Sequence, residues 1–518
     1  MRDSSRDGWQ NRLETHVLTN FEPIWTLLQR VEPLRRPTNR ALIGRAILKI
    51  PTRPNPFSTM APYSSWESLT DRRYDGRHLP PAAQDGLPPE DKVADLMMRR
   101  GAGAECPKST VMFAYFAQWF TDGFLRSDRR PERDPRRNDT NHELDLTPLY
   151  GVRKEFTDAL RAHQGGRLKS QLIGGAEYPP YLYEGGTVKP EFAGLSVVRP
   201  GQIPPDRFDS LFATGSDTTN SQIGFVMLNV LFLREHNRIA GLLAAEYPGW
   251  DDERLYATAR NVLIVLLIKI VIEEYINHIA PYHFKFGADP WDFKREAWYR
   301  TNWMAIEFNL LYRWHSLIPS NLRVAGAELP IWDTIFRTDL VTENGIARLF
   351  ADASNQPAGR VGMLNTDPAL RETEAASVRE ARAVGLARYN AYRELAKFPR
   401  VTSFEQITGD PERVAALRDV YRDVDEIELY PGLFAEDTRA NSVLPSLIGR
   451  MVGIDAFSQA LTNPLLSPRL FDERTFSPLG MEVIRTTGTL SDVLNRNVPE
   501  SPGNHFVAMT RRDWRRER

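Results

Sequence analysis

Two long segments with helical periodicity, 217–246 and 252–280, most strongly limit what this chain can fold into. Their apolar residues recur at the three- to four-residue spacing of a helix that buries one face. The turn signal Pro248-Gly249 separates them. Shorter segments with helical patterns lie at 111–126, 301–316, 369–397 and 411–424. Alternating runs typical of strands are scarce, so the sequence predicts a mostly α fold with few, short strands.

The longest apolar run, 262–268, is followed at once by Lys269 and then by Glu273 and Glu274. It is too short, and too soon charged, to span a bilayer, so we expect a buried core helix. The N-terminal stretch MRDSSRDGWQNRLETH has no apolar core of a signal peptide. We therefore expect a protein in the cytoplasm, or on the cytoplasmic face of a membrane.

The chain has 518 residues, which predicts either several domains or one large helical body. Its formal net charge is -1, which gives no indication of a nucleic-acid partner. Cys106 is the single cysteine, so an intrachain disulfide is impossible, which fits a reducing compartment or a fold that does not rely on disulfides.

The N-terminal region, residues 1–60, is predicted to form an arm of two or three amphipathic helices ahead of a main domain at 61–518. Apolar residues such as Phe21, Ile24 and Leu28 recur there at helical spacing. Two interpretations are open. The arm either packs on the main domain, or lies at a membrane surface or channel mouth with apolar side chains dipping into lipid.

The run Phe308-Asn309-Leu310-Leu311-Tyr312-Arg313-Trp314-His315 combines a tyrosine and a histidine in an apolar setting. If the run is helical, Tyr312 and His315 lie on one face, one turn apart. Histidine is a common axial ligand of haem iron. A tyrosine one turn away could be oxidised by that haem to a radical, which can take hydrogen from a fatty acid.

Several segments together resemble the animal-type haem peroxidase superfamily and, within it, the cyclooxygenases (prostaglandin-endoperoxide synthases). The similar stretches are FNLLYRWHSLIP (308–319), LREHNR (233–238), IKIVIEEY (268–275), YSSWESL (63–69), AGRVG (358–362) and LYPGL (429–433). The family's disulfide-rich N-terminal module is missing, as expected for a bacterial-type homologue. The resemblance implies one large helical haem-peroxidase-like domain, haem b as cofactor, and a homodimer.

The resemblance also implies roles for the central residues. His315 matches the axial ligand of the haem iron, and Tyr312 matches the tyrosine that becomes a radical. Tyr275 matches the residue that hydrogen-bonds this tyrosine. For Tyr312 the structural alternative is an aromatic residue that only fills the core.

On the distal side the chain departs from the family. Gln118 matches the distal glutamine, but Asp122 stands where the family has a histidine. Both residues face the same way if the segment is helical. An aspartate, with a reference pKa of about 3.9, is a poor acid at neutral pH, so we expect weak peroxidase turnover. Alternatively, Asp122 is a solvated or capping carboxylate without a role in the chemistry.

A fatty acid needs a cation or phenol for its carboxylate and an apolar tunnel for its tail. Tyr282 matches the family's tyrosine at the channel mouth, and Arg45 or Lys49 is expected as its cationic partner. The residues that match tunnel positions are Ile276, Phe120, Phe124, Phe308 and Ser458. Asp455, close to this tunnel in sequence, is unexpected; it either alters substrate choice or points outward.

Three functions are consistent with these residues. The first is a haem-dependent dioxygenase that adds O₂ to a polyunsaturated fatty acid, or, as in the related α-dioxygenases, to carbon 2 of a fatty acid. The second is a peroxidase acting on small electron donors, which Asp122 disfavours. The third is a haem- or lipid-binding protein with little catalysis, which Asp122 favours.

Overall fold

The computed structural model describes residues 9–49, 74–126, 134–290, 295–296, 298 and 304–517. The predicted domain boundary at residue 60 and the family-like segment at 63–69 lie outside these residues.

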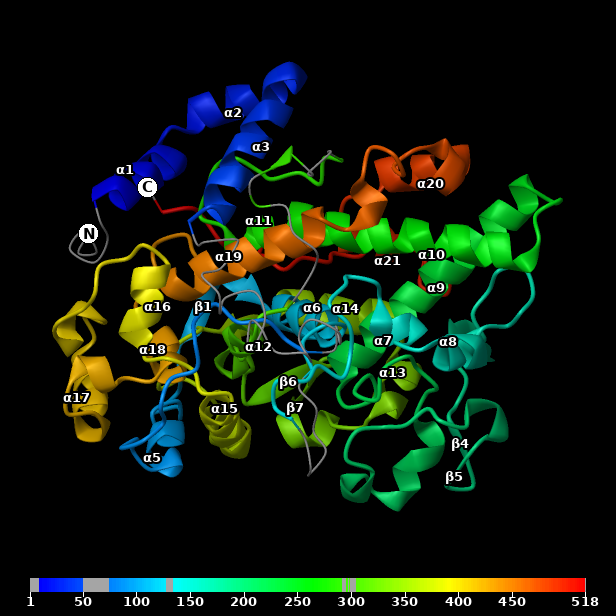
Figure 1. The fold of residues 1–518 in the computed structure, drawn as a ribbon. Helices are drawn as coiled ribbons and strands as arrows, with labels where there is room; N and C mark the ends of the chain where they lie inside the picture. Colours follow the sequence, from blue (N-terminus) through cyan, green and yellow to red (C-terminus); the bar gives the residue numbers. More distant parts are fainter. Residues whose placement is uncertain are drawn as a thin grey trace.

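Two long antiparallel helices form the centre of the molecule (Figure 1). Helix α9 (Ile223–Glu246) packs against α10 (Asp252–Lys269), whose first turn is capped by the side chain of Asp251. A π-helical segment, Ile270–Ile276, and α11 (Asn277–Ile279) continue α10 without a break. Within the described residues, this Asp252–Ile279 helix is apolar and long enough to cross a membrane, but 78% of its apolar window is buried inside the protein. The predicted core helix is thus confirmed.

Further helices surround this pair. Helix α6 (Val111–Asp122) packs on α9, and α20 (Glu473–Thr486) packs on α10. The other helices of the body are α5 (Glu90–Asp95), α7 (Thr147–Tyr150), α8 (Lys154–Leu160), α12 (Ile306–Leu311), α13 (Thr338–Asn344), α14 (Ile346–Asn355), α15 (Arg371–Ala383), α16 (Tyr389–Leu395), α17 (Pro411–Val420), α18 (Leu429–Ala435), α19 (Ser446–Leu461) and α21 (Leu490–Asn495).

Strands in the described part of the chain form four small antiparallel pairs. The pairs are β1 (Glu105–Thr110) with β8 (Pro357–Gly359), β2 (Gln171–Ile173) with β3 (Ala176–Tyr178), β4 (Tyr183–Glu184) with β5 (Thr187–Val188), and β6 (Asn321–Val324) with β7 (Ala327–Pro330). The turn between β6 and β7 has positive φ at Ala325 and Gly326, as a tight hairpin turn requires. The predicted mostly α fold with few, short strands is confirmed.

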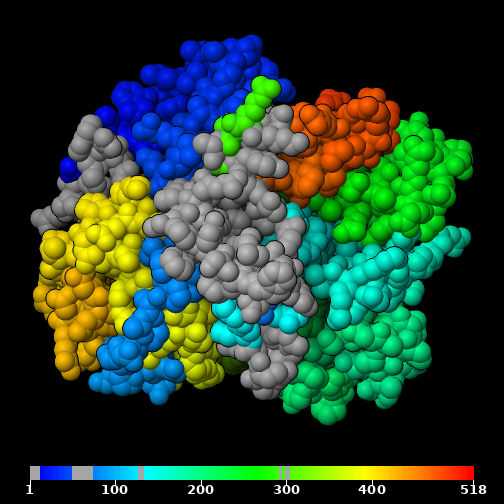
Figure 2. All heavy atoms as spheres, in the orientation of Figure 1, coloured from blue at the N-terminus to red at the C-terminus, as the bar shows by residue number. Residues whose placement is uncertain are grey.

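Helices α1 (Trp9–Asn20), α2 (Glu22–Arg30) and α3 (Glu32–Ile47) form the N-terminal arm. Ile43 and Ile47 are fully buried because α3 packs against α19 of the body. The arm lies on the outside of the molecule, in blue in Figure 2. It carries seven of the eleven exposed large apolar side chains of the described residues: Leu13, Val17, Phe21, Ile24, Leu27, Leu34 and Leu48. One face of the arm therefore packs on the body, while another presents apolar groups to the surroundings.

Two predicted helices are wrong in extent. The predicted helix 301–316 is described only from residue 304, and there α12 is helical from Ile306 to Leu311. The predicted helix 369–397 is divided into α15 and α16, because Gly385 adopts a positive φ of 66° that no helix interior allows.

Three other predicted helices keep their place but are shorter. Helix α6 ends at Asp122 rather than 126, since Gly123 is its C-terminal cap. Helix α9 begins at Ile223 rather than 217, because residues 216–221 form a loop of hydroxyl-rich turns. Helix α17 ends at Val420 rather than 424.

Candidate functional site

The chain leaves the helix at Tyr312, so the prediction that Tyr312 and His315 share one helix face is wrong. The amide of Trp314 donates to the carbonyl oxygen of Tyr312 at 2.9 Å, which tightens the chain into a turn. A short 3₁₀ segment, His315–Leu317, then begins with the histidine. The orientation of the two side chains is therefore set by this turn and not by helical spacing.

His315 faces a buried carboxylate. Its Nδ1 lies 3.1 Å from Oε1 of Glu374, a residue of α15 with no solvent exposure. The ring is not aligned for a full hydrogen bond, so the contact is electrostatic. Sequence reasoning missed this residue.

Glu374 is held as an anion by neutral donors as well as by His315. Thr366 donates to Oε1 at 2.8 Å, and the Tyr430 hydroxyl donates to Oε2. Burial by itself raises the pKa of Glu374, but His315 and these hydroxyls more than offset it, and the net pKa lies below the usual value. The structure thus favours a carboxylate, not a carboxylic acid, beside the histidine.

The other side of the His315 ring is accessible. The side chain is 16% exposed, while Nδ1 has no exposure, so the exposed part is the edge away from Glu374, where Nε2 lies. A histidine whose Nδ1 faces a carboxylate and whose Nε2 is accessible has the arrangement of a metal-ligating histidine. His315 therefore fits the axial ligand of a haem.

Tyr312 and Tyr275 meet inside the protein. Their hydroxyls approach each other without the alignment of a full hydrogen bond. Burial raises the pKa of Tyr312, the Tyr275 phenol opposes this rise by stabilising the ionised form, and nearby Asp455 adds to it. Both phenols thus remain protonated at neutral pH and lie as a pair, while the hydrogen bond that the resemblance implied between them stays a prediction.

Aromatic rings surround this tyrosine pair. The ring of Phe308 lies 5.0 Å from that of Tyr312, and the ring of Phe120 lies 5.5 Å from that of Tyr275. Among the described residues, Tyr275 also contacts the rings of Phe113 and Phe116, Tyr312 contacts that of Trp314, and Phe124 lies between Phe120 and Phe308. The predicted tunnel residues Phe120, Phe124 and Phe308 are therefore brought together beside the tyrosine pair, although Phe120 lies on α6, Phe124 just after it and Phe308 on α12.

Tyr275 and Ile276 lie in the π-helical segment at the end of α10. Such segments are rare and occur frequently at functional sites, where the extra residue redirects side chains. Ile276 is buried, and Tyr282 follows just after α11. The ring of Tyr282 lies 6.2 Å from that of Phe286, which in turn lies 4.9 Å from Phe457 of α19. Ile276 thus lies on the same continuous helix as Tyr275, and the ring of Tyr282 is linked to α19 through Phe286.

Gln118 and Asp122 both contact the segment that precedes α9, which confirms that they face the same way. Gln118 is exposed and accepts a hydrogen bond from Gln222. Asp122 accepts from Ser216 at 2.9 Å and also from Thr218. Arg126 lies 3.8 Å from its other oxygen. Asp122 is therefore bound to the loop that precedes α9, which supports its alternative role as a capping carboxylate.

Asp455 points inward and not outward. Its side chain is 2% exposed, and its Oδ2 lies 2.9 Å from Nε2 of His78. The hydroxyl of Ser458 donates to the backbone oxygen of Asp455 at 3.0 Å. Both residues lie on α19, which packs against α12. The contact between Asp455 and His78, close to Tyr312, was not predicted, because His78 is far away in the sequence.

Both cations that were predicted as partners of Tyr282 are instead paired with a carboxylate of the arm. Arg45 is 62% exposed and pairs with Glu14 of α1 at 3.0 Å. Lys49 pairs with the other oxygen of the same carboxylate. The structure thus uses both cations to join α1 to the end of α3.

A third cation lies close to Tyr282. Arg450 of α19 stabilises the ionised form of the Tyr282 phenol, although burial raises the pKa of Tyr282 overall. Burial has the opposite effect on Arg450 and lowers its pKa, because burial disfavours the charged guanidinium. Its guanidinium stacks 4.5 Å from the ring of Phe398 and donates to the carbonyl of Ala396 at 2.9 Å. Arg450 is a second residue that sequence reasoning missed.

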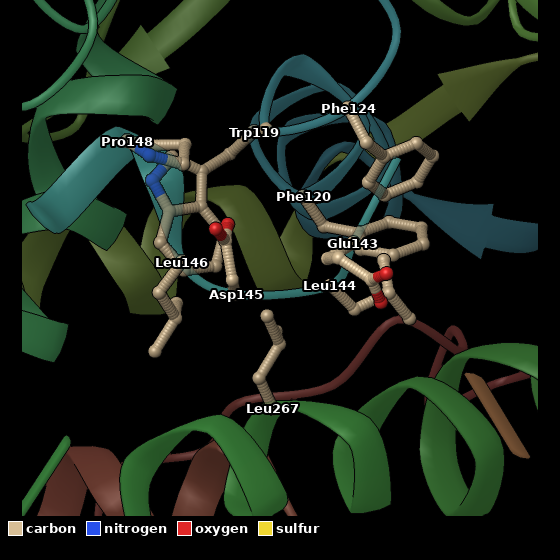
Figure 3. A pocket seen from close by; sticks show the side chains of 10 residues that line it. Trp119, Phe120, Phe124, Glu143, Leu144, Asp145, Leu146, Pro148 and Leu267 are labelled. Atoms are coloured by element: carbon tan, nitrogen blue, oxygen red, sulfur yellow. The ribbon is translucent and has the colours of Figure 1, made fainter. Parts of the chain in front are cut away.

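Phe120 and Phe124 also line a small cavity between α6 and α10 (Figure 3). Its volume is about 10 Å³, enough for one water molecule. Glu143 and Asp145 line one side, and Leu267 lies opposite. A fatty-acid tail that reached this point would have to displace side chains.

Both missed residues have a sequence signal. Glu374 lies on the apolar side of α15, in line with Val378 and Ala381, where a carboxylate is unexpected. Arg450 interrupts an apolar run between Ile448 and Met451. A charged residue on a buried helix face indicates a partner, but the sequence alone does not name it.

Comparisons with known proteins agree with this geometry. Residues 123–506 match the family of animal haem peroxidases, whose members bind haem. The chain is 32% identical over 508 residues to prostaglandin G/H synthase 2 of Equus caballus, covering 95% of this chain and 81% of that protein. Two solved structures share the fold. Fatty acid alpha-dioxygenase of Arabidopsis thaliana has a TM-score of 0.70 at 19% identity, covering 91% of this chain and 87% of that one. Peroxidase A of Dictyostelium discoideum has a TM-score of 0.67 at 18% identity, covering 85% and 93%. The predicted resemblance is therefore confirmed, and the chain belongs to the animal haem peroxidase family.

Proposed function

We propose that this protein is a haem-dependent fatty-acid dioxygenase that uses Tyr312 as its radical residue. The observation that carries the proposal is the buried Tyr312–Tyr275 pair, three residues from a histidine whose Nδ1 faces a carboxylate. The similarity to prostaglandin G/H synthase 2 and to alpha-dioxygenase supports it. Haem, when bound at His315, would supply the oxidising equivalent that removes one electron from Tyr312.

The reaction then balances as the addition of O₂ to one C–H bond. Tyr312 loses an electron and its phenolic proton, and Tyr275 stabilises the phenol oxygen as the proton leaves. The resulting phenoxyl radical takes a hydrogen atom from the fatty acid. O₂ adds to the carbon radical, and the peroxyl radical takes a hydrogen atom back from Tyr312. A fatty-acid hydroperoxide is formed and Tyr312 is restored.

The substrate carboxylate is proposed to bind between Tyr282 and Arg450. A guanidinium that is partly buried gives a stronger contact with a carboxylate than an exposed one. Arg45 is the comparison, because it is exposed and already paired with Glu14. We expect Arg450→Gln to raise KM for a fatty acid at least about tenfold, the loss of a charge-assisted hydrogen bond. Arg45→Gln, the matched control, should change KM less than about twofold.

Peroxide reduction is proposed to be slow. Position 122 holds an aspartate in place of the family's distal histidine, so no histidine acts as the distal base there. The aspartate is held by Ser216, Thr218 and Arg126. Hydroperoxide would then serve mainly to start the radical reaction. Rates of peroxide reduction typical of a distal-histidine peroxidase would contradict this part of the proposal.

The alternative reaction is oxygenation at carbon 2, which the likeness to alpha-dioxygenase supports. It differs in which carbon lies beside Tyr312. Analysis of the products separates the two, since a 2-hydroperoxide forms also from a saturated fatty acid, whereas hydrogen removal between two double bonds needs a polyunsaturated one.

The test is O₂ uptake by the haem-loaded protein with linoleate and with palmitate, each with and without a trace of alkyl hydroperoxide. We expect uptake that Tyr312→Phe abolishes while the haem spectrum is unchanged. Tyr247→Phe, the same change at a tyrosine that follows α9 and stacks on Trp250, should retain uptake. Absence of uptake with every fatty acid, despite a normal haem spectrum, would overturn the proposal in favour of a haem protein with little catalysis.

Peripheral contact with a membrane is proposed for the arm. Residues 9–49 contain seven basic and three acidic residues, and 511–518 contain five basic and two acidic, although the whole chain has a net charge of -1. Both segments contact residues 282–283, because Arg516 donates to the carbonyl oxygen of Tyr282 at 3.0 Å and the amide of His283 donates to that of Leu18. Exposed apolar side chains next to an excess of positive charge suit an anionic lipid surface.

Vesicle sedimentation tests this contact. We expect binding to vesicles that contain phosphatidylglycerol, and Leu27→Glu should reduce that binding at least about tenfold. Leu172→Glu is the control, because Leu172 is 75% exposed but lies in β2, away from the arm. Equal binding by both variants would contradict the proposal.

A further inference from the structure

We infer that Glu374 is a positioning residue: it holds the imidazole of His315, the proposed haem ligand, and keeps the bound iron in the ferric state. This inference rests on the proposed role of His315. It adds a residue and a function, the control of the iron's reduction potential, that the proposed oxygenation does not require.

Two groups from separate elements, the His315 imidazole and the Glu374 carboxylate, lie close together. Nδ1 of His315 and Oε1 of Glu374 are 3.1 Å apart. The carboxylate has no solvent exposure and the Nδ1 atom has none either. Water therefore cannot screen this contact, and a negative charge acts on the imidazole with little attenuation.

The carboxylate of Glu374 keeps its negative charge. The Thr366 and Tyr430 hydroxyls occupy both oxygens of Glu374 as donors. Neutral donors stabilise the carboxylate without cancelling its charge, in contrast to an arginine or lysine. Glu374 thus offers a full negative charge to the N–H of the imidazole.

A negative charge at this place affects a metal that the histidine binds. A buried carboxylate beside Nδ1 of a ligating histidine favours the tautomer that carries its proton on Nδ1 and makes the ligand more basic. A more basic ligand stabilises ferric iron over ferrous iron. Loss of such a partner changes metal affinity or activity by about 10–100-fold.

The experiment is a spectroelectrochemical titration of the haem-loaded wild-type protein and the Glu374→Gln variant. At a fixed potential we expect the ratio of ferrous to ferric protein to rise at least about tenfold in Glu374→Gln, equivalent to about 59 mV for one electron. The iron–imidazole stretching frequency in the resonance Raman spectrum should fall. Glu374→Asp keeps the charge and should give values between those of wild type and Glu374→Gln.

The control is Tyr430→Phe, which removes a donor to Glu374 but not the charge. The carboxylate then acts more strongly on His315, so the ratio should move in the opposite direction to Glu374→Gln. A general disturbance of the pocket would move both variants the same way and would overturn the inference.

His315→Gly separates failure of this inference from failure of the proposed function. If His315→Gly leaves the haem spectrum unchanged, the axial ligand is elsewhere and both are wrong. If His315→Gly alters the spectrum but Glu374→Gln changes the ratio less than twofold, the role of Glu374 alone is overturned.

Discussion

Glu274 should make the stability of this protein depend on pH near neutrality. This carboxylate is buried in the π-helical segment, next to Tyr275, and accepts a hydrogen bond from the amide of Leu490 at 2.8 Å. Burial raises the pKa of Glu274 from 4.5 to about 7, although the Leu490 amide opposes the rise. We predict that Glu274→Gln removes the resulting pH dependence.

The sign and size follow from linkage between ionisation and folding. The folded protein binds the Glu274 proton more tightly than the unfolded chain does. Its contribution to stability is therefore fully present below pH 4.5 and is lost as the pH rises through about 7. A pKa difference of about 2.5 units, at 1.36 kcal/mol each, corresponds to about 3 kcal/mol. Gln has almost the same shape, stays neutral, and can still accept from Leu490.

The assay is urea unfolding of the haem-loaded protein and of Glu274→Gln between pH 4.5 and 8. The variant should gain about 3 kcal/mol over wild type across this range. Glu482→Gln is the control, because Glu482 is 51% exposed on neighbouring α20, and its difference from wild type should stay constant. A constant difference for Glu274→Gln as well would refute the reasoning.

Two further predictions concern packing and polar contacts. Asp122→Ala leaves the Ser216 and Thr218 hydroxyls without their acceptor, so the free energy of unfolding should fall by about 1–3 kcal/mol in urea titrations; an unchanged midpoint would contradict the network. Gly224→Ala places a Cβ 2.4 Å from the ring of Tyr115, and overpacking of about 1–3 kcal/mol should lower Tm; a Tm equal to wild type would show that α6 and α9 can separate there.

The long helices and the identity of the central residues could be predicted, because both depend on local patterns. Periodicity places α10, and the run around Tyr312 carries its family resemblance in adjacent residues. The helix end at Leu311 could not be predicted in this way. It depends on the backbone turn at Trp314, which no apolar periodicity reveals.

The partners of the central residues could not be predicted, because they are distant in sequence. Glu374 reaches His315 across 59 positions, and the sequence shows only a carboxylate on an apolar helix face. Arg45 seemed suited to a substrate carboxylate, but Glu14 from α1 already occupies it. Burial and competition for partners are properties of the folded chain, and they decide between roles that composition leaves equal.

The π-helical segment Ile270–Ile276 also determines the rotational phase of the helix that contains it. Each residue of an α-helix turns the chain by about 100°, and a π-turn accommodates one additional residue without changing the helix direction. The part of the helix that ends at Lys269 and the part that carries Tyr275 are therefore rotated about the helix axis relative to each other. The rotation is that of one residue, about 100°. Deleting any one residue of the segment would leave the axis in place but rotate one half against the other. An aligned relative with a one-residue gap here would lose the meeting of Tyr275 with Tyr312 while keeping every residue type intact.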